Sequence, residues 1–400
     1  MDGNHPDVTT DVMVVGSGPA GLAVGACLRK AGIDFVMLEK DQQLGSSWRR
    51  HYDRLHLHTD RAHSSLPHLP LPRSYPRYPS RQQVIDYLEA YARAFSLAPR
   101  FGEEVVKVRP LDGGWEVTSR ASRYHTRAVV LSTGYNAEPV RPHWPGMEAY
   151  RGVLLHSSDY RSGARFEGKD VLVVGFGNSG GEIAIDLFEQ GARPSIVVRS
   201  PVNLLPRDLL GLPLMTWTQV LSRLPPGLAD ALSAPLLRLK FGDISRLGLR
   251  KSSQGPLAQV VGGWRIPLID VGTVDLIRQK HIQVRPGIRA LTERGVSFDD
   301  GSEASFDAIV LATGFRAALG RIVDTAEVID ASGKPLERGG ETRIPGLYLC
   351  GFNVTPTGML REIALEARHI AAEVSRQLAA TNRAPSPVPP PRMEGTPLRG

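Results

Sequence analysis

Apolar runs, glycine-rich turns and amphipathic stretches follow one another along the chain in the order that is typical of α/β proteins. Residues 11–15 form an apolar run that predicts a strand, 19–30 predict a helix that ends near Gly32, and 33–39 predict a second strand. Residues 165–200 repeat this order. The fold class that we predict is therefore α/β, with two Rossmann-like dinucleotide-binding domains.

The other periodic segments extend this pattern. We expect helices over 82–96 and 359–378, and strands over 104–109, 115–118, 128–131, 282–284, 296–298 and 308–311. Asp112-Gly113 and Asp300-Gly301 predict tight turns between neighbouring strands. Residues 381–400 contain six prolines, and this composition predicts a disordered tail.

Two glycine-rich turns have the spacing G-x-G-x-x-G, and each lies between a predicted strand and a predicted helix. The first consists of Gly16, Ser17, Gly18, Pro19, Ala20 and Gly21, and the second of Gly175, Phe176, Gly177, Asn178, Ser179 and Gly180. In this context the glycines allow a tight turn, and backbone N–H groups at the helix N-terminus approach a pyrophosphate. We therefore expect one dinucleotide at each turn.

The residues that end the following strands differ in charge. Glu39 follows the first turn, and its carboxylate suits a free ribose 2′-hydroxyl. Arg199 follows the second turn, and its guanidinium suits a 2′-phosphate; Ser200 and Arg207 are weaker candidates for the same contact. FAD at the first turn and NADPH at the second are the simplest nucleotides with these two riboses.

We expect the second nucleotide-binding domain to be inserted into the first. The predicted FAD domain comprises 8–160 and 303–380, and the predicted NADP domain comprises 161–302. Two similar segments, 129–134 and 309–314, each end in Thr-Gly. We expect the chain to cross between the domains at these two points.

Composition excludes several classes of protein. The hydrophobic fraction of 42% is that of an ordinary globular protein, and the net charge of +7 accompanies no nucleic-acid-binding motif. Cys27 and Cys350 are the two cysteines, so a C-x-x-C redox pair or zinc site is absent. We expect no metal, no nucleic-acid partner, no transmembrane segment and a cytoplasmic location.

Two segments do not fit the regular pattern. Residues 49–81 hold seven arginines and five of the eleven histidines, and we expect at least one of these arginines to bind the FAD pyrophosphate or an acidic substrate. Residues 202–241 are rich in leucine and proline. They have three interpretations: buried core, the wall of an apolar substrate tunnel, or a peripheral contact with a membrane surface.

A family resemblance rests on residues 150–160. Tyr150, Gly152, His156 and Tyr160 resemble the F-x-G-x-x-x-H-x-x-x-Y/W fingerprint of class B flavin-dependent monooxygenases, with Tyr in place of the first Phe. Segments 52–58, 78–88, 204–211 and 267–272 resemble the auxin-forming YUCCA-type enzymes of plants and their bacterial relatives. The similarity extends over about residues 10–375.

The resemblance implies an NADPH- and O2-dependent monooxygenase that forms a C4a-(hydro)peroxyflavin. The reaction it favours is oxidative decarboxylation of an aryl α-keto acid, such as indole-3-pyruvate to indole-3-acetate. Residues 351–361 depart from the plant pattern, and this leaves the substrate open. No side chain is a certain catalytic residue, and His58 and Asn178 are the candidates.

Each further residue has two interpretations. We expect Trp48 either near the flavin or as a core aromatic. We expect His58 either near the flavin or as a solvated histidine. Asn178 is expected to contact the nicotinamide or the flavin, or else to cap a helix. For His156 we expect a structural role in coupling the domains rather than general-base catalysis.

Three alternative functions remain open from the sequence. The first is a monooxygenase that acts on the nitrogen or sulfur of a soft nucleophile, for example N,N-dimethylaniline. The second is an NADPH–flavin reductase or oxidase without oxygenation. The third is a non-enzymatic redox sensor. The oligomeric state also stays open.

Overall fold

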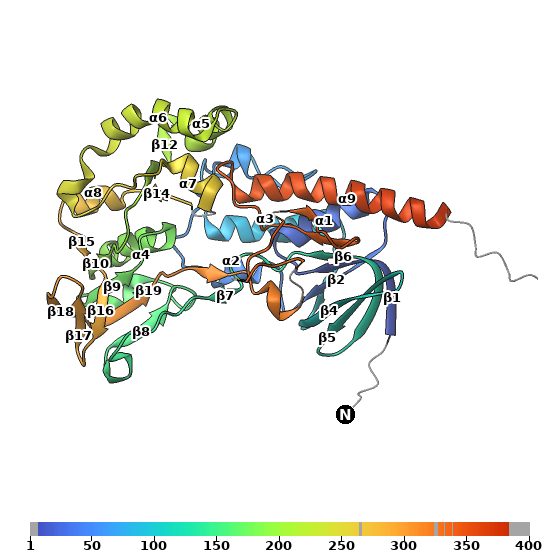
Figure 1. Ribbon diagram of the computed structural model, residues 1–400, viewed down its shortest axis with the longest axis horizontal. Helices are drawn as coiled ribbons and strands as arrows, with labels where there is room; N and C mark the ends of the chain where they lie inside the picture. Colours follow the sequence, from blue (N-terminus) through green and yellow to red (C-terminus); the bar gives the residue numbers. More distant parts are fainter. Residues whose placement is uncertain (1–6, 264–265, 324–326, 332, 338, 384–400) are drawn as a thin grey trace, which may run out of the picture.

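The computed structural model describes residues 7–263, 266–323, 327–331, 333–337 and 339–383. The last helix ends at Arg383, so most of the predicted proline-rich tail, residues 384–400, lies outside the described residues. Two sheets with their own helices make up most of the fold (Figure 1). The sequence-based fold class, α/β with Rossmann-type units, is confirmed.

The first unit is built on an eight-stranded sheet. Its strands are β1 (Asp7–Val15), β2 (Phe35–Glu39), β3 (Arg100–Phe101), β4 (Val105–Leu111), β5 (Gly114–Ser119), β6 (Arg123–Leu131), β21 (Gly340–Glu341) and β22 (Leu347–Leu349). Strand β1 lies at the centre and pairs in parallel with β2 and β6. Helices α1 (Pro19–Lys30), α3 (Arg81–Ala94) and α9 (Met359–Arg383) lie together above this sheet in Figure 1.

The second unit is built on a five-stranded parallel sheet in the order β15-β10-β9-β19-β8. Its strands are β8 (Val153–His156), β9 (Asp170–Val174), β10 (Arg193–Val197), β15 (Gln283–Arg285) and β19 (Ala308–Leu311). Helices α4 (Asn178–Glu189) and α8 (Thr273–Arg278) belong to this unit, as does a small sheet of β16 (Ile288–Leu291), β17 (Gly295–Phe298) and β18 (Glu303–Ser305).

Because β8 and β19 pair with each other, the second unit extends beyond the range 161–302 that we predicted for it. We expected both strands in the first domain, outside the range 161–302. Strand β19 instead pairs in parallel with β9 on one side and with β8 on the other. The sheet of the second unit therefore begins at Val153 and ends at Leu311, because these two strands come from chain segments on either side of the insertion.

Two connections join the units side by side. Strand β7 (Glu138–Pro139) follows β6, and β20 (Phe315–Arg316) follows β19; the two pair antiparallel. The Thr313 hydroxyl donates to the carbonyl of Val140, and the Val140 amide donates to the carbonyl of Gly314. The chain thus crosses between the units just after the two Thr-Gly segments.

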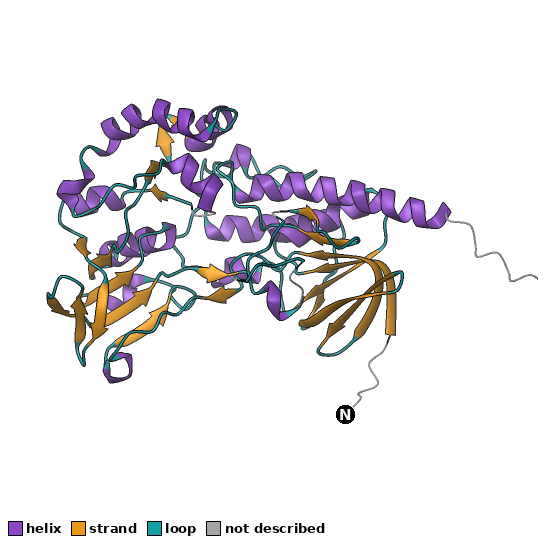
Figure 2. Ribbon diagram, viewed as in Figure 1, coloured by secondary structure: helices purple, strands orange, loops and turns teal. Residues whose placement is uncertain are grey.

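The leucine-rich segment forms an additional layer, which we call the cap and define as residues 204–270. It contains β11 (Leu204–Pro206), β12 (Asp208–Leu209), β13 (Leu212–Pro213), α5 (Leu214–Leu221), α6 (Pro226–Phe241), α7 (Pro256–Gly263) and β14 (Leu268–Asp270). Figure 2 shows these helices in purple at the top left, above the second sheet. We predicted no elements here, because helix α6 is apolar on more than one face and has no clear helical period.

Candidate active site

The three glycines of the first turn have separate geometric tasks. Gly16 has a φ of 103°, and a Cβ there would lie 2.6 Å from the carbonyl oxygen of Ser132 on the crossing segment. A Cβ on Gly21 would lie 1.9 Å from the Gly16 oxygen, so helix α1 needs glycine in order to pack on the turn. Gly18 has nothing within 4 Å of such a Cβ, which leaves open space in front of the helix.

The second turn repeats this arrangement in the second unit. Gly175 has a φ of 117°, and a Cβ there would lie 2.5 Å from the carbonyl oxygen of Ala312. A Cβ on Gly180 would lie 2.0 Å from the Gly175 oxygen, whereas Gly177 again faces open space. Two segments far apart in sequence therefore build the same turn, each closed by its own crossing segment.

The helices that follow these turns suit an anionic ligand. Gly18 and Gly177 are the N-caps of α1 and α4, neither supplies a side-chain capping bond, and neither helix has an acidic residue in its first turn. The first backbone N–H groups of a helix need an acceptor, and the helix dipole favours negative charge there. Both turns therefore fit the pyrophosphate of a dinucleotide.

Glu39 holds the first turn in shape and lines the cavity beside it. Its Oε2 atom accepts hydrogen bonds of 2.8 Å from both the backbone nitrogen and the hydroxyl of Ser17. Its Oε1 atom accepts a bond of 3.0 Å from the Asp41 nitrogen. Glu39 as a whole is 8% exposed. Glu39 ends β2, where the sequence predicts a contact with the ribose 2′-hydroxyl, and this contact remains a prediction.

Arg199 lies beside the second turn but outside the cavity. Val197, two residues earlier, pairs with Val174, which directly precedes Gly175. Arg199 is exposed and Ser200 is half-buried. Their contact with a 2′-phosphate therefore also remains a prediction.

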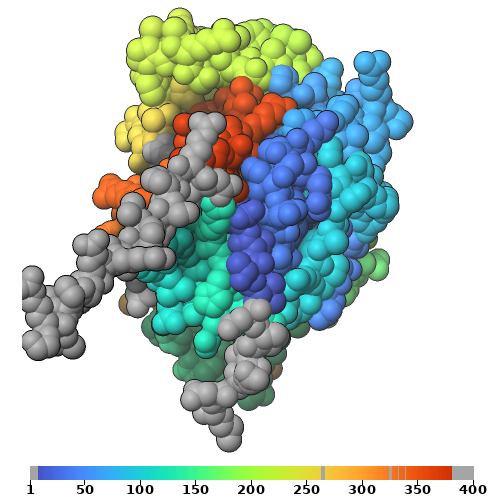
Figure 3. Space-filling view, turned by 90° about the vertical axis from the view of Figure 1, so that its right-hand side faces the viewer, coloured from blue at the N-terminus to red at the C-terminus, as the bar shows by residue number. Residues whose placement is uncertain are grey.

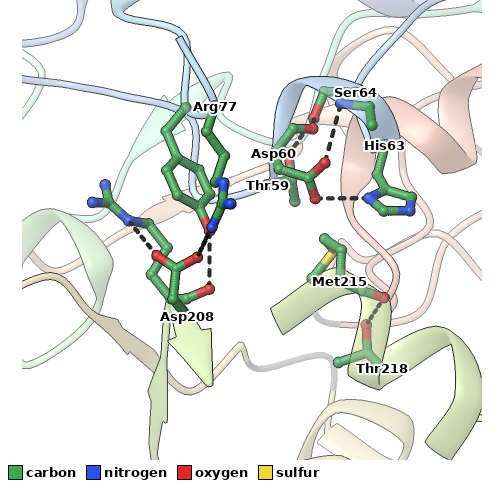
Figure 4. A network of polar contacts seen from close by, with 11 residues as sticks. Thr59, Asp60, His63, Ser64, Arg77, Asp208, Met215 and Thr218 are labelled. Carbon is green, nitrogen blue, oxygen red and sulfur yellow. Dashed lines mark hydrogen bonds and ion pairs between the residues drawn. The ribbon is translucent and has the colours of Figure 1, made fainter. Parts of the chain in front are cut away.

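Arg207 stacks on an aromatic ring of residues 49–81. Its guanidinium lies over the Tyr78 ring, 4.2 Å from the centroid, and its contact with a 2′-phosphate remains a prediction. The Tyr78 hydroxyl donates to Asp208 Oδ1 over 2.7 Å, and Arg77 approaches the same oxygen at 3.1 Å. Figure 4 shows Arg77 and Asp208 facing each other across this contact. These four residues fasten the cap to residues 49–81.

One cavity of about 1410 Å³ joins both turns to the cap. Its lining includes Gly16, Gly18, Pro19, Ala20 and Glu39 at one side, and Gly177, Asn178 and Ser179 at the other. Ser17, Gly21, Gly175, Phe176, Gly180, Arg199 and Ser200 lie outside this lining, so the structure brings only part of the predicted set together. A cavity of this size exceeds a typical small-ligand pocket, in keeping with more than one bound molecule.

The cap end of the cavity is apolar. Met215 of α5, Thr59 of the first unit and Gly358 before α9 meet there: a Cβ on Gly358 would lie 2.7 Å from Thr59 Cγ2 and 3.4 Å from Met215 Sδ. Figure 4 shows Met215 and Thr218 below Thr59 and Asp60. Among the described cap residues that line the cavity, Asp230 carries the single charged side chain, and it accepts the Leu257 and Ala258 amides.

Asn178 is not a helix cap. It is the first residue of α4, after the N-cap Gly177. Its Oδ1 atom accepts a hydrogen bond of 2.8 Å from the backbone nitrogen of Ile269 in β14, so it ties the cap to the second turn. Asn178 and Ser179 both line the cavity, and a contact of Asn178 with a nucleotide remains a prediction.

His58 lines the cavity and faces a buried carboxylate. Its Nε2 atom lies 2.9 Å from Glu182 Oε1 on α4, and the Glu182 side chain is 4% exposed. Arg54 Nη1 lies 3.7 Å from Glu182 Oε2, and Arg54 also forms a two-point pair with Glu189. His58 is therefore held by the second unit, and the solvated-histidine interpretation is wrong.

Trp48 belongs to α2 (Ser46–Arg50); it packs as a core aromatic, and its position near the flavin remains a prediction. It lines the cavity, and it packs against the hydrophobic cores of both units. Tyr52 and Leu55, a few residues later, are part of the second unit's core. The segment 48–55 is thus shared between the units.

The arginines of 49–81 do not form an open cationic surface in the cavity. Carboxylates bind most of them: Arg49 pairs with Glu89, Arg50 with Asp41, Arg54 with Glu189, Arg77 with Asp208 and Arg81 with Asp53. Arg50 is the one that lines the cavity, on the side of Glu39. The structure therefore gives no support to an arginine from this segment at the cap end.

The fingerprint residues have structural positions. His156 at the end of β8 is fully buried, and its ring meets the Phe315 ring edge to face at 5.0 Å. Burial, together with nearby Arg141, lowers the pKa of His156. The Tyr160 hydroxyl donates to Asp186 Oδ2 over 2.5 Å, and the Gly163 amide donates to the same oxygen. These contacts join the linker to β20 and α4 and agree with a structural role.

Sequence reasoning missed one buried carboxyl near the first turn. Glu366 of α9 accepts the Gly351 amide over 2.8 Å, and Gly351 lines the cavity. Burial raises the pKa of Glu366 to about 7. No local signal marks this residue, because its surroundings come from the distant segment 339–353.

Comparison with known proteins identifies the family. Residues 13–207 match the family described as pyridine nucleotide-disulphide oxidoreductase. The chain is 39% identical to indole-3-pyruvate monooxygenase YUCCA1 of Oryza sativa over 93% of both chains, and 39% identical to indole-3-pyruvate monooxygenase YUCCA6 of Arabidopsis thaliana over 92% and 91%. The chain belongs to the YUCCA-type flavin monooxygenase family.

Solved structures agree with this assignment. The flavin-containing monooxygenase from Stenotrophomonas maltophilia is 25% identical, with a TM-score of 0.72 over 93% of this chain and 99% of that one. Cyclohexanone monooxygenase from Rhodococcus sp. Phi1 bound to NADP⁺ is 19% identical, with a TM-score of 0.68 over 94% and 85%, and shares the fold.

Family membership confirms the enzyme class and the cofactors that the sequence predicted. The protein is an FAD-dependent monooxygenase that uses NADPH, and it acts on a small molecule together with O2. The reductase and redox-sensor alternatives do not agree with this membership. In the described part of the chain, no helix has the length and apolarity needed to cross a bilayer.

Proposed function

We propose that this enzyme oxidatively decarboxylates an aryl α-keto acid, with indole-3-pyruvate converted to indole-3-acetate as the best candidate. The observation that carries the proposal is the 39% identity to enzymes named for indole-3-pyruvate over nearly the whole chain. When bound, FAD that is reduced by NADPH supplies the chemistry that activates O2. The chain itself binds, orients and keeps water away from the reacting groups.

The cap end of the cavity supports an aromatic substrate. Met215, Trp217 and Leu236 line it, and the Trp217 indole nitrogen is satisfied by the Leu209 carbonyl at 3.0 Å, so the ring presents mainly an apolar surface. Such a surface suits an indole or phenyl ring and excludes water. The family assignment and this surface point to the same substrate class.

The acid group of the substrate has to point away from the cap. No described cap residue in the lining offers a cation, and Asp230 would repel a carboxylate. The basic residues of the lining, Lys40, Arg50, His51, His58 and Arg321, all lie outside the cap. We therefore orient the ring toward α5 and α6, and the keto acid toward the two turns.

The test is NADPH consumption with mass detection of products over a panel of indole-3-pyruvate, phenylpyruvate, a thioether and a tertiary amine. We expect coupled turnover with both keto acids and formation of the acid that is one carbon shorter. The thioether is the competing substrate, because the apolar cap accepts a neutral sulfide as well. Sulfoxide formation without decarboxylation of either keto acid would contradict the proposal.

A further inference from the structure

Helix α6 carries a row of leucines that the described residues leave largely exposed. Leu228, Leu232 and Leu239 are 50%, 57% and 82% exposed, and with Pro235 they follow the spacing i, i+4, i+7 and i+11 of one helical stripe. On the other side of the helix, Ala229 and Phe241 are buried. The helix is therefore apolar both toward the protein and toward the outside.

The neighbouring elements of the cap extend this surface. Among the described residues, eight of the fourteen exposed large hydrophobic side chains lie between 210 and 266. Those outside α6 are Leu210, Leu212, Val220, Val261 and Ile266. Figure 3 shows the yellow-green atoms of the cap raised at the top of the molecule. Concentrated exposure of this kind marks an interaction surface, whereas scattered single leucines do not.

The polar residues around the apolar stripe are basic. Arg223, Arg238, Lys240 and Arg246 are all exposed. Of the two acidic residues in the same stretch, Asp230 is turned inward to the amides of α7, and Asp243 caps a short helix and lies 3.7 Å from Arg246. A leucine stripe bordered by Lys and Arg is typical of a helix that lies in the interface of an anionic bilayer.

The cavity reaches the surface at this stripe. Leu232 and Ile266 are both exposed and cavity-lining, and Ser233, Leu236 and Leu237 form the inner side of the same helix. An apolar molecule dissolved in a bilayer would thus pass from the lipid to the cap end of the cavity without crossing water.

We propose that the cap docks on the surface of a membrane that contains anionic phospholipid, with α6 lying in the plane of the interface. Helix α6 has 16 residues, fewer than the roughly 20 that span a bilayer, so it rests on the membrane and does not cross it. A second copy is the less favourable occupant. A two-fold contact through this face would place the basic residues of one copy against those of the other.

Vesicle flotation tests the proposal on the FAD-loaded full-length enzyme. Vesicles of phosphatidylcholine alone are compared with vesicles that also contain phosphatidylglycerol. We expect binding that requires phosphatidylglycerol and weakens as salt is added. Leu228→Glu combined with Leu239→Glu should lower the bound fraction at least about tenfold, because two apolar contacts with the lipid are lost.

Matched variants separate docking from folding. Neither Leu228 nor Leu239 lines the cavity, so the double variant should keep its thermal transition and its NADPH consumption with a water-soluble substrate. Leu111→Glu, at a leucine that is 40% exposed on β4 and does not line the cavity, is the control and should bind vesicles like the parent. Arg238→Ala with Lys240→Ala should reduce binding only to the anionic vesicles.

Three results would overturn the proposal. One is that the parent enzyme floats with neither kind of vesicle. Another is that the leucine double variant and Leu111→Glu bind equally well. The third is a dimer in light scattering that the leucine double variant dissociates, because this would show that a second copy covers the stripe.

Discussion

Replacing Gly177 by alanine separates nucleotide binding from folding at the second turn. The residue has a φ of −102° and a ψ of −175°, which alanine adopts without strain, and a Cβ there meets nothing within 4 Å. Alanine also restricts the unfolded chain, so we expect the stability to be unchanged or raised by up to about 1 kcal/mol. The added methyl group lies in the open space in front of α4, where we place the NADPH pyrophosphate.

The expected loss is in NADPH affinity. If the methyl group displaces one charge-assisted hydrogen bond between the turn and a phosphate oxygen, the cost is about 1.5–3 kcal/mol. This corresponds to a dissociation constant about 10- to 150-fold higher. The assay is NADPH titration of the FAD-loaded enzyme, with the flavin content and thermal transition measured on the same samples.

Two companion variants sharpen the test. Gly180→Ala places its Cβ 2.0 Å from the Gly175 oxygen, so it should lower the melting temperature. This variant shows what a packing defect at the turn looks like in the same assays. Gly18→Ala is the equivalent of Gly177→Ala at the first turn and should reduce FAD retention instead. Unchanged NADPH affinity in Gly177→Ala, or loss of FAD from it, would refute the assignment of the two turns.

Three further predictions concern single side chains. Tyr160→Phe removes a hydroxyl donor from the buried Asp186 carboxylate, so chemical denaturation should show a loss of about 1.5–3 kcal/mol with little change in NADPH affinity. The folded-state pKa of Glu366, about 7, lies above its ordinary value of 4.5, so the stability that this group contributes is full below pH 4.5 and is lost as the pH rises through 7. In Glu366→Gln the melting temperature should therefore depend less on pH over this window. A pH profile like that of the parent would contradict the reasoning. Asn178→Ala leaves the Ile269 amide without its acceptor, whereas Asn178→Asp keeps one; if the residue acts only through β14, the Asp variant restores the NADPH affinity that the Ala variant loses.

Local sequence was sufficient for the nucleotide-binding turns. The glycine spacing between a strand and a helix marks each turn, although Gly16 and Gly175 also pack against the distant residues Ser132 and Ala312. Helix α1 occupies the predicted residues 19–30. The edges of the inserted unit were not predictable in this way, because β19 pairs with β8 across more than 150 residues of chain. Sheet membership at such separation has no signature in either strand alone.

The polar contacts of residues 49–81 show the same limit. An arginine-rich segment suggests an open cationic surface, but Glu182 and Glu189 on α4 pair with Arg54, and Asp208 in the cap pairs with Arg77. Their spacing from the arginines in sequence carries no hint of contact. The longest cap helix was missed for a different reason: α6 faces both an apolar cavity and the exterior, so its amphipathic period is weak.

The shared segment 48–55 has a consequence for how the two cofactors influence each other. Tyr52 and Leu55 are fixed in the core of the second unit, while Trp48 also touches the core of the first. Any rotation of the second unit on arrival of NADPH therefore moves Trp48, which lines the shared cavity and which we predict to lie near the flavin. Thermodynamic linkage makes such an effect mutual: whatever NADPH does to the tightness of flavin binding, the flavin does equally to NADPH.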